Sequence, residues 1–573
     1  MSDWELQERR EEMARREAGC TQIRPALSWG LIILFLLVIF SVPLVQHISE
    51  FRDYAAGERR SLLPQVYNVF SLFPTALKMP GDSGPSGILA HVFAVNRALL
   101  KEIKGFEEAL DDQSVIGKWV RPKIQYVLTA WLGAGNEKAY CGEQPWLFYR
   151  PGVDYLSGPP FLDPVQLQKR AAGGSEWATP IEPDPRVAIL SLREQLSQRG
   201  IALIVMPTPI KATIQPEKLT HRYDQHHTEL KNPSYGRFKE EMEREGVLIF
   251  DVAPILMGAK IQSGQDQYLA TDTHWRPEAV ELAAEKLADF IRDYVPLPGM
   301  PPSGYRAERS VVTHLGDLAV MLSLPDKQRI FPLEKVAIRK IWGGGGEPWQ
   351  SKKTADVLIL GDSFSNIYSL GAMGWGEGAG FIEQLSFALQ RPLDRISRND
   401  SGAFATREIL AGELARGRDR LSGKRLVIYQ FAIRELAVGN WKQIDLKLGV
   451  PPPLKCLVIP PGREKVVRGK IEAVSAVPRA GSVAYKDHVM AILLADLEAD
   501  GRPLAETNAV VYMRSMTDNV WAAAARYRPG ETVELRLMAW SDVADRYERI
   551  NRSELDDEAL QLVEPCWGEV VKR

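Results

Sequence analysis

The stretch Val357-Leu358-Ile359-Leu360-Gly361-Asp362-Ser363 decides the fold that we predict for this chain. Four apolar residues followed at once by Gly-Asp-Ser predict a buried strand that ends at a tight turn. Ligands of open α/β sheets bind beyond the carboxyl ends of the strands, so Ser363 is a candidate nucleophile. The alternative is an ordinary strand end whose serine caps the next helix. The same three letters recur at Gly81-Asp82-Ser83, where no apolar run precedes them and a loop is predicted.

A serine nucleophile needs a base within hydrogen-bond reach, and that base is usually oriented by a third group. The stretch Thr271-Asp272-Thr273-His274-Trp275-Arg276-Pro277-Glu278 offers both. Pro277 suits a first helical turn, and apolar residues then recur at helical spacing. We therefore expect His274 in a loop before a helix, with the Asp272 carboxylate two residues away. The alternative is a helix start with a packed aromatic, in which His274 is only a solvated neighbour.

Strands and helices alternate on both sides of these stretches. The pattern predicts strands at residues 201–206, 247–252, 357–360 and 425–431, and helices that begin near 185, 237, 277, 381 and 406. Such alternation is typical of a parallel, doubly wound sheet. We therefore predict an α/β domain over residues 137–447.

The N-terminal part has the pattern of a membrane anchor. Residues 26–45 are almost wholly apolar and carry no charge, which is about the length that crosses a bilayer as a helix. Five arginines precede this span and three follow it closely, which favours a cytoplasmic N-terminus. We expect a cytoplasmic segment at 1–25, a transmembrane signal-anchor at 26–45 and a membrane-proximal helical region at 46–136, in which 88–110 is the longest candidate helix.

The C-terminal part follows a proline-rich boundary. Pro451-Pro452-Pro453 and Pro460-Pro461-Gly462 indicate a linker over 448–463. Alternating apolar and charged residues, clearest at 532–537, then predict strands. We expect residues 464–573 to form a mainly β domain, either a barrel or a sandwich. Its aromatic and arginine side chains suggest a glycan-binding groove or, alternatively, ordinary core and rim packing.

Composition excludes some functions. The 573 residues carry a formal net charge of −2, which gives no basic field for nucleic acid. The eight histidines and four cysteines show no metal-type spacing. Because the ends of compact domains often lie close together, we predict a disulfide between Cys456 and Cys566, which leaves Cys141 unpaired.

Asp-x-His before a helix, followed later by Gly-Asp-Ser-Phe-Ser after a strand, resembles the periplasmic polysaccharide O-acetyltransferases of the AlgJ and AlgX type, a permuted branch of the SGNH-hydrolase-like fold. The resemblance extends over residues 137–441 and includes the aromatic stretch 142–149, Ile204 to Pro207 with Lys211, and Phe431 to Leu436. It implies a triad and a set of oxyanion or substrate candidates. The triad is Ser363, His274 and Asp272; the candidates are Asn399, Asp362 and Arg276, together with backbone near Ser363.

The resemblance also implies an activity. It is acetyl transfer through an acetyl-serine to hydroxyls of an exopolysaccharide, as in alginate biosynthesis, without a cofactor or metal. A membrane-bound acyltransferase would supply the acetyl groups, and the catalytic domain would be periplasmic on a single-pass anchor in the cell inner membrane. Two alternatives stay open at this point: a carbohydrate acetyl esterase, and a noncatalytic glycan-binding or assembly protein.

Overall fold

The computed structural model describes residues 25–55, 114–173, 181–223, 228–449, 456–478 and 485–555, together with 563–571 and isolated positions between these ranges. It divides into two compact units, residues 1–121 and 122–573. Gly81-Asp82-Ser83 and most of the expected helix at 88–110 lie outside the described residues.

The first unit contains one long apolar helix. Helix α2 spans Pro25–Ala55. Within the described residues, Pro25–Arg52 is the one helix long and apolar enough to cross a membrane, with a mean hydropathy of 2.6 and none of its most apolar window buried. This supports an apolar N-terminal anchor or signal.

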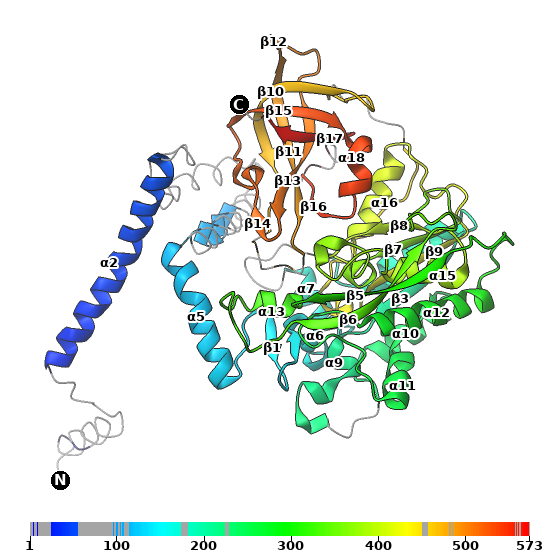
Figure 1. Ribbon diagram of the computed structural model, residues 1–573, viewed down its shortest axis with the longest axis horizontal. Helices are drawn as coiled ribbons and strands as arrows, with labels where there is room; N and C mark the ends of the chain where they lie inside the picture. Colours follow the sequence, from blue (N-terminus) through cyan, green and yellow to red (C-terminus); the bar gives the residue numbers. More distant parts are fainter. Residues whose placement is uncertain are drawn as a thin grey trace. The chain divides into compact units, whose positions relative to one another are not determined.

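A five-stranded parallel sheet forms the centre of the second unit (Figure 1). Its order is β4-β3-β9-β7-β8, and every neighbouring pair is parallel. The strands are β3 (Ala202–Thr208), β4 (Leu248–Ile249), β7 (Val357–Gly361), β8 (Asp394–Ser397) and β9 (Leu426–Ala432). All residues of β7 and β9 are buried, as expected for a parallel sheet covered on both faces. The predicted α/β fold is confirmed.

The helices predicted to begin near 185, 237, 277, 381 and 406 start at those positions or within two residues of them. Proline opens α8 (Pro185–Ser197) and α12 (Pro277–Tyr294), and Asp184 caps α8 by accepting from the N–H of Arg186. The other principal helices of this domain are α10 (Tyr235–Arg244), α11 (Ala253–Ser263), α15 (Phe381–Leu389) and α16 (Ala405–Ala415). Residues from these helices and from the sheet share one core.

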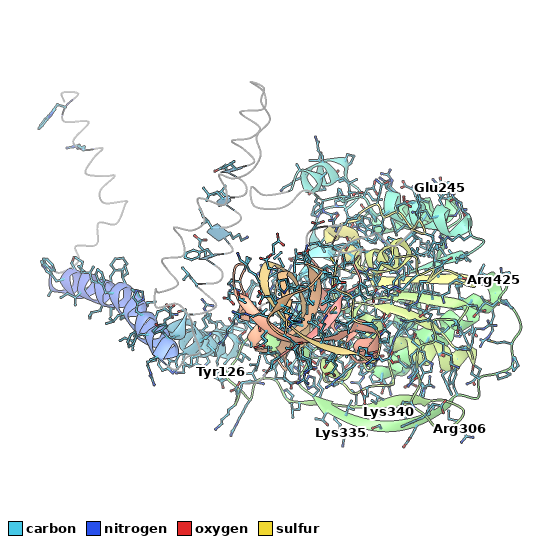
Figure 2. The ribbon with its side chains drawn as sticks, turned by 90° about the horizontal axis from the view of Figure 1, so that it is seen from above. Tyr126, Glu245, Arg306, Lys335, Lys340 and Arg425 are labelled. Carbon is cyan, nitrogen blue, oxygen red and sulfur yellow. The ribbon has the colours of Figure 1, made fainter. Side chains whose placement is uncertain are left out.

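An antiparallel ribbon that the sequence did not predict connects α12 to the site. Strands β5 (Arg306–His314) and β6 (Glu334–Trp342) pair along their whole length. Arg306, Lys335 and Lys340, labelled in Figure 2, lie on this ribbon. Its end pairs His314 with Glu334; the ring of His314 packs against that of Trp375, with centroids 5.4 Å apart, and Glu334 accepts from the N–H of Ala270.

The C-terminal part is a closed barrel rather than a sandwich (Figure 1). Strands β10, β11, β13, β17 and β15 pair in a ring, because β11 contacts both β10 and β13. These strands are β10 (Glu464–Val474), β11 (His488–Ala499), β13 (Ala509–Thr517), β15 (Thr532–Ala539) and β17 (Cys566–Val570). Closure leaves the five strands of the ring without free edges. The short strand β16 (Asn551–Ser553) pairs with β11.

The predicted disulfide is wrong. Cys456 and Cys566 are both free thiols, as is Cys141. The Sγ of Cys566 instead lies 3.5 Å from the carbonyl oxygen of Leu457. Two cysteines near the two ends of one domain can lie close together and still have thiols that do not face each other.

Candidate active site

Ser363 lies at the predicted strand end, buried, and opens the short helix α14 (Ser363–Asn366). Asp362 caps that helix by accepting from the N–H of Phe364 at 2.9 Å. Its carboxylate also accepts from the side chain of Gln430 at 2.8 Å and from the N–H of Ala432 at 2.6 Å. Asp362 therefore fixes the Ser363 turn to the end of β9.

Gln430, in β9, connects the carboxyl ends of β3, β7 and β9. Its Oε1 accepts from the N–H of Asp362 at 2.9 Å and from the hydroxyl of Ser365 at 2.6 Å. Its Nε2 donates to the hydroxyl of Thr208, at the end of β3. Because buried polar networks with satisfied partners are rigid, this arrangement holds the Ser363 turn in one position.

His274 and Asp272 form the second half of the site. The Nδ1–H of His274 donates to Oδ1 of Asp272 at 2.7 Å. The other oxygen of Asp272 accepts from Nε1 of Trp375 at 2.8 Å and from the backbone N–H of Asp317 at 2.9 Å. The Nε2 of His274 is buried and has no hydrogen-bond partner in the described part of the chain. While Nδ1 carries the proton that is shared with Asp272, Nε2 is the nitrogen that can accept a proton.

The His274 loop and the Ser363 turn are bonded to each other. The Nε1 of Trp275 donates to the carbonyl oxygen of Phe364 at 3.0 Å, and the Tyr368 hydroxyl donates to the carbonyl oxygen of Trp275 at 2.8 Å. The rings of His274 and Phe364 have centroids 4.8 Å apart. The structure thus brings the two predicted motifs together at the carboxyl ends of the strands.

Charges within the site move the pKa values in opposite directions. Burial alone would lower the pKa of His274, but the hydrogen bond and charge of Asp272 outweigh it and raise that pKa. Burial alone would raise the pKa of Asp272, and the bond to His274 instead holds that pKa well below its usual range. Each group favours the charged form of the other, which is the electrostatic role of a triad carboxylate.

A second carboxylate, Asp317, lies beside this pair. Burial and the charge of Asp272 raise the pKa of Asp317 to about 7. Its Oδ1 accepts from the N–H of Thr273 at 2.7 Å. Gly316 permits this approach, since a Cβ there would lie 2.2 Å from the backbone carbon of Thr271. No local sequence pattern marks Asp317 as a partner of Asp272 or of the His274 loop.

Asp272, His274 and Asp317 also offer atoms within 4.8 Å of one another, the spacing of a metal-ligand cluster. The Nδ1 of His274 carries the hydrogen bond to Asp272, however, so it is not available as a ligand while that bond exists. Metal binding would therefore compete with the His274–Asp272 pair.

The three other predicted candidates lie in different settings. Asn399 is buried beside helix α14. Its Oδ1 accepts from Nδ2 of Asn366 at 2.6 Å, and its own Nδ2 has no hydrogen-bond partner in the described part of the chain. Asp362 is engaged in the contacts given above, and a carboxylate in these contacts only accepts. Arg276 precedes α12 and lies 3.4 Å from Glu278, partly exposed.

Two further side chains hold the loop that leads to Asp272. Glu334 accepts from the N–H groups of Ala270 and Thr271 at 2.9 and 2.7 Å. The ammonium group of Lys211 is buried and donates to the carbonyl oxygens of Leu147 and Ala270, at 2.6 and 3.0 Å. Desolvation lowers the pKa of Lys211 to about 8. Trp146 and Phe148 of the aromatic stretch 142–149 are buried around this lysine and therefore pack in the core.

A small pocket lies next to the His274 loop, beyond the ends of β3 and β9. Its lining includes Tyr149, Ile210, Lys211, Thr273 and Arg434. The Nη1 of Arg434 and the Oγ1 of Thr273 are buried without a hydrogen-bond partner in the described part of the chain. Arg434 also stacks over the ring of Tyr149, 5.1 Å from its centroid. These two side chains line a pocket that has room for about one water-sized group.

Residues 170–432 match the family model described as "SGNH hydrolase-like domain, acetyltransferase AlgX". These residues form an AlgX-type SGNH hydrolase-like domain. The resemblance predicted from the sequence is thereby confirmed for this part of the chain. The match includes all of the strands of the parallel sheet and both motifs of the candidate site.

Curated relatives of this AlgX-type domain are proteins named probable alginate O-acetylase AlgJ. The chain is 30% identical to the one from Pseudomonas fluorescens over 183 residues, which are 30% of this chain and 44% of the relative. It is 29% identical to the one from Pseudomonas syringae pv. tomato over 191 residues, 32% of this chain and 48% of the relative. The chain spans about half the length of these relatives or less.

Two solved structures are also similar. The O-acetyltransferase domain of Pseudomonas putida AlgJ has a TM-score of 0.39 and 20% identity, with 53% of this chain and 93% of that chain covered. Pseudomonas aeruginosa AlgX has a TM-score of 0.38 and 13% identity, with 70% of this chain and 90% of that chain covered.

Proposed function

We propose that this chain is a membrane-anchored O-acetyltransferase that moves an acetyl group through Ser363 to a polysaccharide hydroxyl. The observation that carries the proposal is the buried His274, bonded to Asp272 through Nδ1 and open at Nε2, beside the Ser363 turn of an AlgX-type domain. An ordinary helix start would not need a buried histidine with one unpartnered nitrogen, because such a group costs free energy in the fold.

In the first step the Oγ of Ser363 attacks the acetyl carbonyl carbon of the donor. The Ser363 proton passes to Nε2 of His274, and Asp272 stabilises the imidazolium that forms. The tetrahedral intermediate then expels the donor's leaving group, which takes the proton from His274. The products are acetyl-Ser363 and the protonated leaving group.

The intermediate's oxyanion needs hydrogen-bond donors. The Nδ2 of Asn399 is buried beside α14 without a partner in the described part of the chain. The N–H of Ser363 is at the first position of α14, where helix N–H groups lack intrahelical acceptors. We assign these two donors to the oxyanion, and we assign Asp362 to positioning of the turn.

In the second step a sugar hydroxyl gives its proton to His274 and attacks acetyl-Ser363. Collapse releases the acetylated sugar and returns the proton to Ser363. Water in place of the sugar would give an esterase with the same residues. The relatives' name, alginate O-acetylase, favours the transferase.

The pocket beside Thr273 suits an acidic acceptor. Alginate is a polymer of sugars that carry carboxylates, and arginine is the preferred partner of a planar carboxylate. The Nη1 of Arg434 has no hydrogen-bond partner among the described residues, Thr273 has a hydroxyl next to His274, and the Lys211 ammonium adds positive charge. We propose that a sugar carboxylate binds there while a hydroxyl of the acceptor approaches Ser363.

Helix α2 would hold the enzyme at the cell inner membrane, with the catalytic domain in the periplasm. Acetyl groups would come from a membrane-bound acyltransferase, near which the anchor keeps this domain. Fusion of alkaline phosphatase after Arg573 tests the topology. We expect activity of this reporter, which works only outside the cytoplasm; an inactive phosphatase together with an active cytoplasmic reporter at the same site would contradict the orientation.

The test of the activity is product analysis with the purified full chain. p-Nitrophenyl acetate serves as donor, with and without an alginate oligosaccharide, and acetylated sugar and free acetate are both measured. We expect acetylated oligosaccharide to be the main product when acceptor is present. Acetate as the only product would establish an esterase, and no turnover with either acceptor would favour the glycan-binding alternative.

A further inference from the structure

Three consecutive residues of the AlgX-type domain are hydrogen-bonded to the C-terminal barrel. The Nη1 of Arg398 donates to the carbonyl oxygen of Ile550 at 3.2 Å. The N–H of Asn399 donates to Oδ1 of Asn551 at 2.8 Å. The carboxylate of Asp400 accepts from the hydroxyl of Tyr485 at 3.2 Å. The loop 398–400 is therefore held from outside the domain that it belongs to.

The contacts of Arg398 and Asn399 are buried, which makes them strong restraints, whereas the Tyr485–Asp400 hydrogen bond is partly exposed. Arg398, Asn399 and Asn551 are each almost fully buried. Arg398 also lies 3.7 Å from the carboxylate of Glu554. Removing one partner of a buried hydrogen bond leaves the other unsatisfied, so the loop and the barrel depend on each other.

The same loop reaches the nucleophile helix on its other side. Arg398 donates its N–H to the carbonyl oxygen of Gly361, two residues before Ser363, at 2.9 Å. The side-chain oxygen of Asn399 accepts from Asn366, in the helix that Ser363 opens. A shift of the barrel end at Asn551 would therefore move Asn399 relative to Ser363.

We propose that the barrel is a working part of the active site, in which Asn551 and Tyr485 position Asn399 for transition-state stabilisation. Asn551 is thus a positioning residue that acts through Asn399. The inference rests on the proposed function, because it uses the oxyanion role assigned to Asn399. It gives the barrel a task that is separate from any binding of glycan on its surface.

An oxyanion donor acts mainly in the transition state, so its displacement lowers kcat more than it raises KM. Misplacement of a catalytic group by about 1 Å can cost about 100-fold in rate. We therefore expect Asn551→Ala to lower kcat for acetylation by p-nitrophenyl acetate about 10- to 100-fold, with KM changed by less than about threefold.

The experiment counts competent sites before it compares rates. The burst of p-nitrophenol in the full chain gives the number of Ser363 sites that react, and kcat is expressed per site. Asn508→Ala is the matched control, since Asn508 is in the same barrel and pairs with the segment at Cys456. We expect a rate per site like that of the wild type for this control.

A double substitution separates positioning from simple loss of folding. If Asn551 acts through Asn399, Asn551→Ala should lower the rate by less than about threefold in an Asn399→Ala background. Full additivity of the two losses would overturn the proposal, as would an unchanged rate per site in Asn551→Ala. A wild-type chain whose Ser363 is never acetylated by p-nitrophenyl acetate would instead refute the Ser363 mechanism, and the role of Asn551 would fail with it.

Discussion

The Oδ2 of Asp317 lies 3.8 Å from Nδ1 of His274, on the side of the ring that already bonds Asp272. Two carboxylates therefore face one imidazole nitrogen. The charge of Asp272 helps to raise the pKa of Asp317 to about 7, and the charge of Asp317 in turn helps to raise the pKa of His274. The ionisation of Asp317 is thus coupled to that of the proposed base.

The substitution Asp317→Asn tests this coupling. It removes the negative charge that Asp317 carries near and above pH 7, which raises the pKa of His274, so more of the histidine is neutral near neutral pH. We expect the acid limb of the kcat/KM profile to move to lower pH. Asp289→Asn, at an exposed carboxylate on α12, is the control, and its profile should match the wild type. An unmoved acid limb in Asp317→Asn would show that the two groups are not coupled.

Asp317→Asn should also change the stability of the fold, in a direction that depends on pH. The pKa of Asp317 rises from an ordinary value of about 4 in the unfolded chain to about 7 in the fold. The folded wild type therefore loses stability as pH rises through this window, where the unfolded carboxyl ionises first. The melting temperature of Asp317→Asn relative to wild type should be higher at pH 8 than at pH 5.

Trp375→Phe tests the support of Asp272. The change removes the 2.8 Å hydrogen bond from Nε1 to Oδ2 of Asp272, and hydrogen bonds to charged groups contribute about 1.5–3 kcal/mol. We expect a loss of unfolding free energy of about this size and a fall in kcat of about tenfold, because Asp272 orients the imidazole. Trp349→Phe loses a similar bond, to the hydroxyl of Ser386 at 2.8 Å, and should lose stability without this fall in kcat. If kcat fell equally in Trp375→Phe and Trp349→Phe, the loss would come from lower stability and not from the support of Asp272.

Arg434→Gln tests the proposed carboxylate pocket. The wild type should prefer an alginate oligosaccharide over the same oligosaccharide with its carboxyl groups reduced to alcohols, by about 10-fold or more in kcat/KM. In Arg434→Gln the ratio of the two kcat/KM values should fall to near one. Arg199→Gln, an exposed arginine paired with Asp419 next to the amino end of β3, is the control and should keep the preference. A wild type that accepts both oligosaccharides equally would reject the pocket as a carboxylate site.

The triad predicts strong non-additivity. Ser363→Ala and His274→Ala should each remove most turnover, and the double variant should lose little more, because the residues act as a unit. Turnover by each variant, measured with its melting temperature, decides this. Losses that multiply in the double variant would mean that Ser363 and His274 act independently.

The sequence signals were strongest where local pattern and chemistry coincide. The apolar run before Gly361 and the Pro277 helix start gave the strand, the helix and the positions of Ser363 and His274. These features depend on neighbouring residues, so they can be recognised without the fold. Lys211 was noticed as part of the family resemblance, and only the structure shows that it donates to Leu147 and Ala270.

The supporting residues could not be found in this way. Three supporting residues each bond a partner that lies more than 60 positions away in sequence, and no local pattern marks such a partner. They are Trp375, which bonds Asp272, Glu334, which bonds Ala270, and Gln430, which bonds Asp362. The β5–β6 ribbon was missed because its first strand is polar or exposed over most of its length, without clear alternation. The contact of Asn551 with Asn399 joins two domains, 152 positions apart, and depends wholly on their packing.

The most direct test of the central claim is the location of the acetyl group on the enzyme. The full chain is mixed with p-nitrophenyl acetate, quenched with acid and digested, and its peptides are measured by mass spectrometry. We predict one acetyl group on Ser363, absent in Ser363→Ala and much slower to form in His274→Ala. An acetyl group on another residue that is competent for transfer, or a folded Ser363→Ala chain with wild-type transfer, would contradict the proposed mechanism.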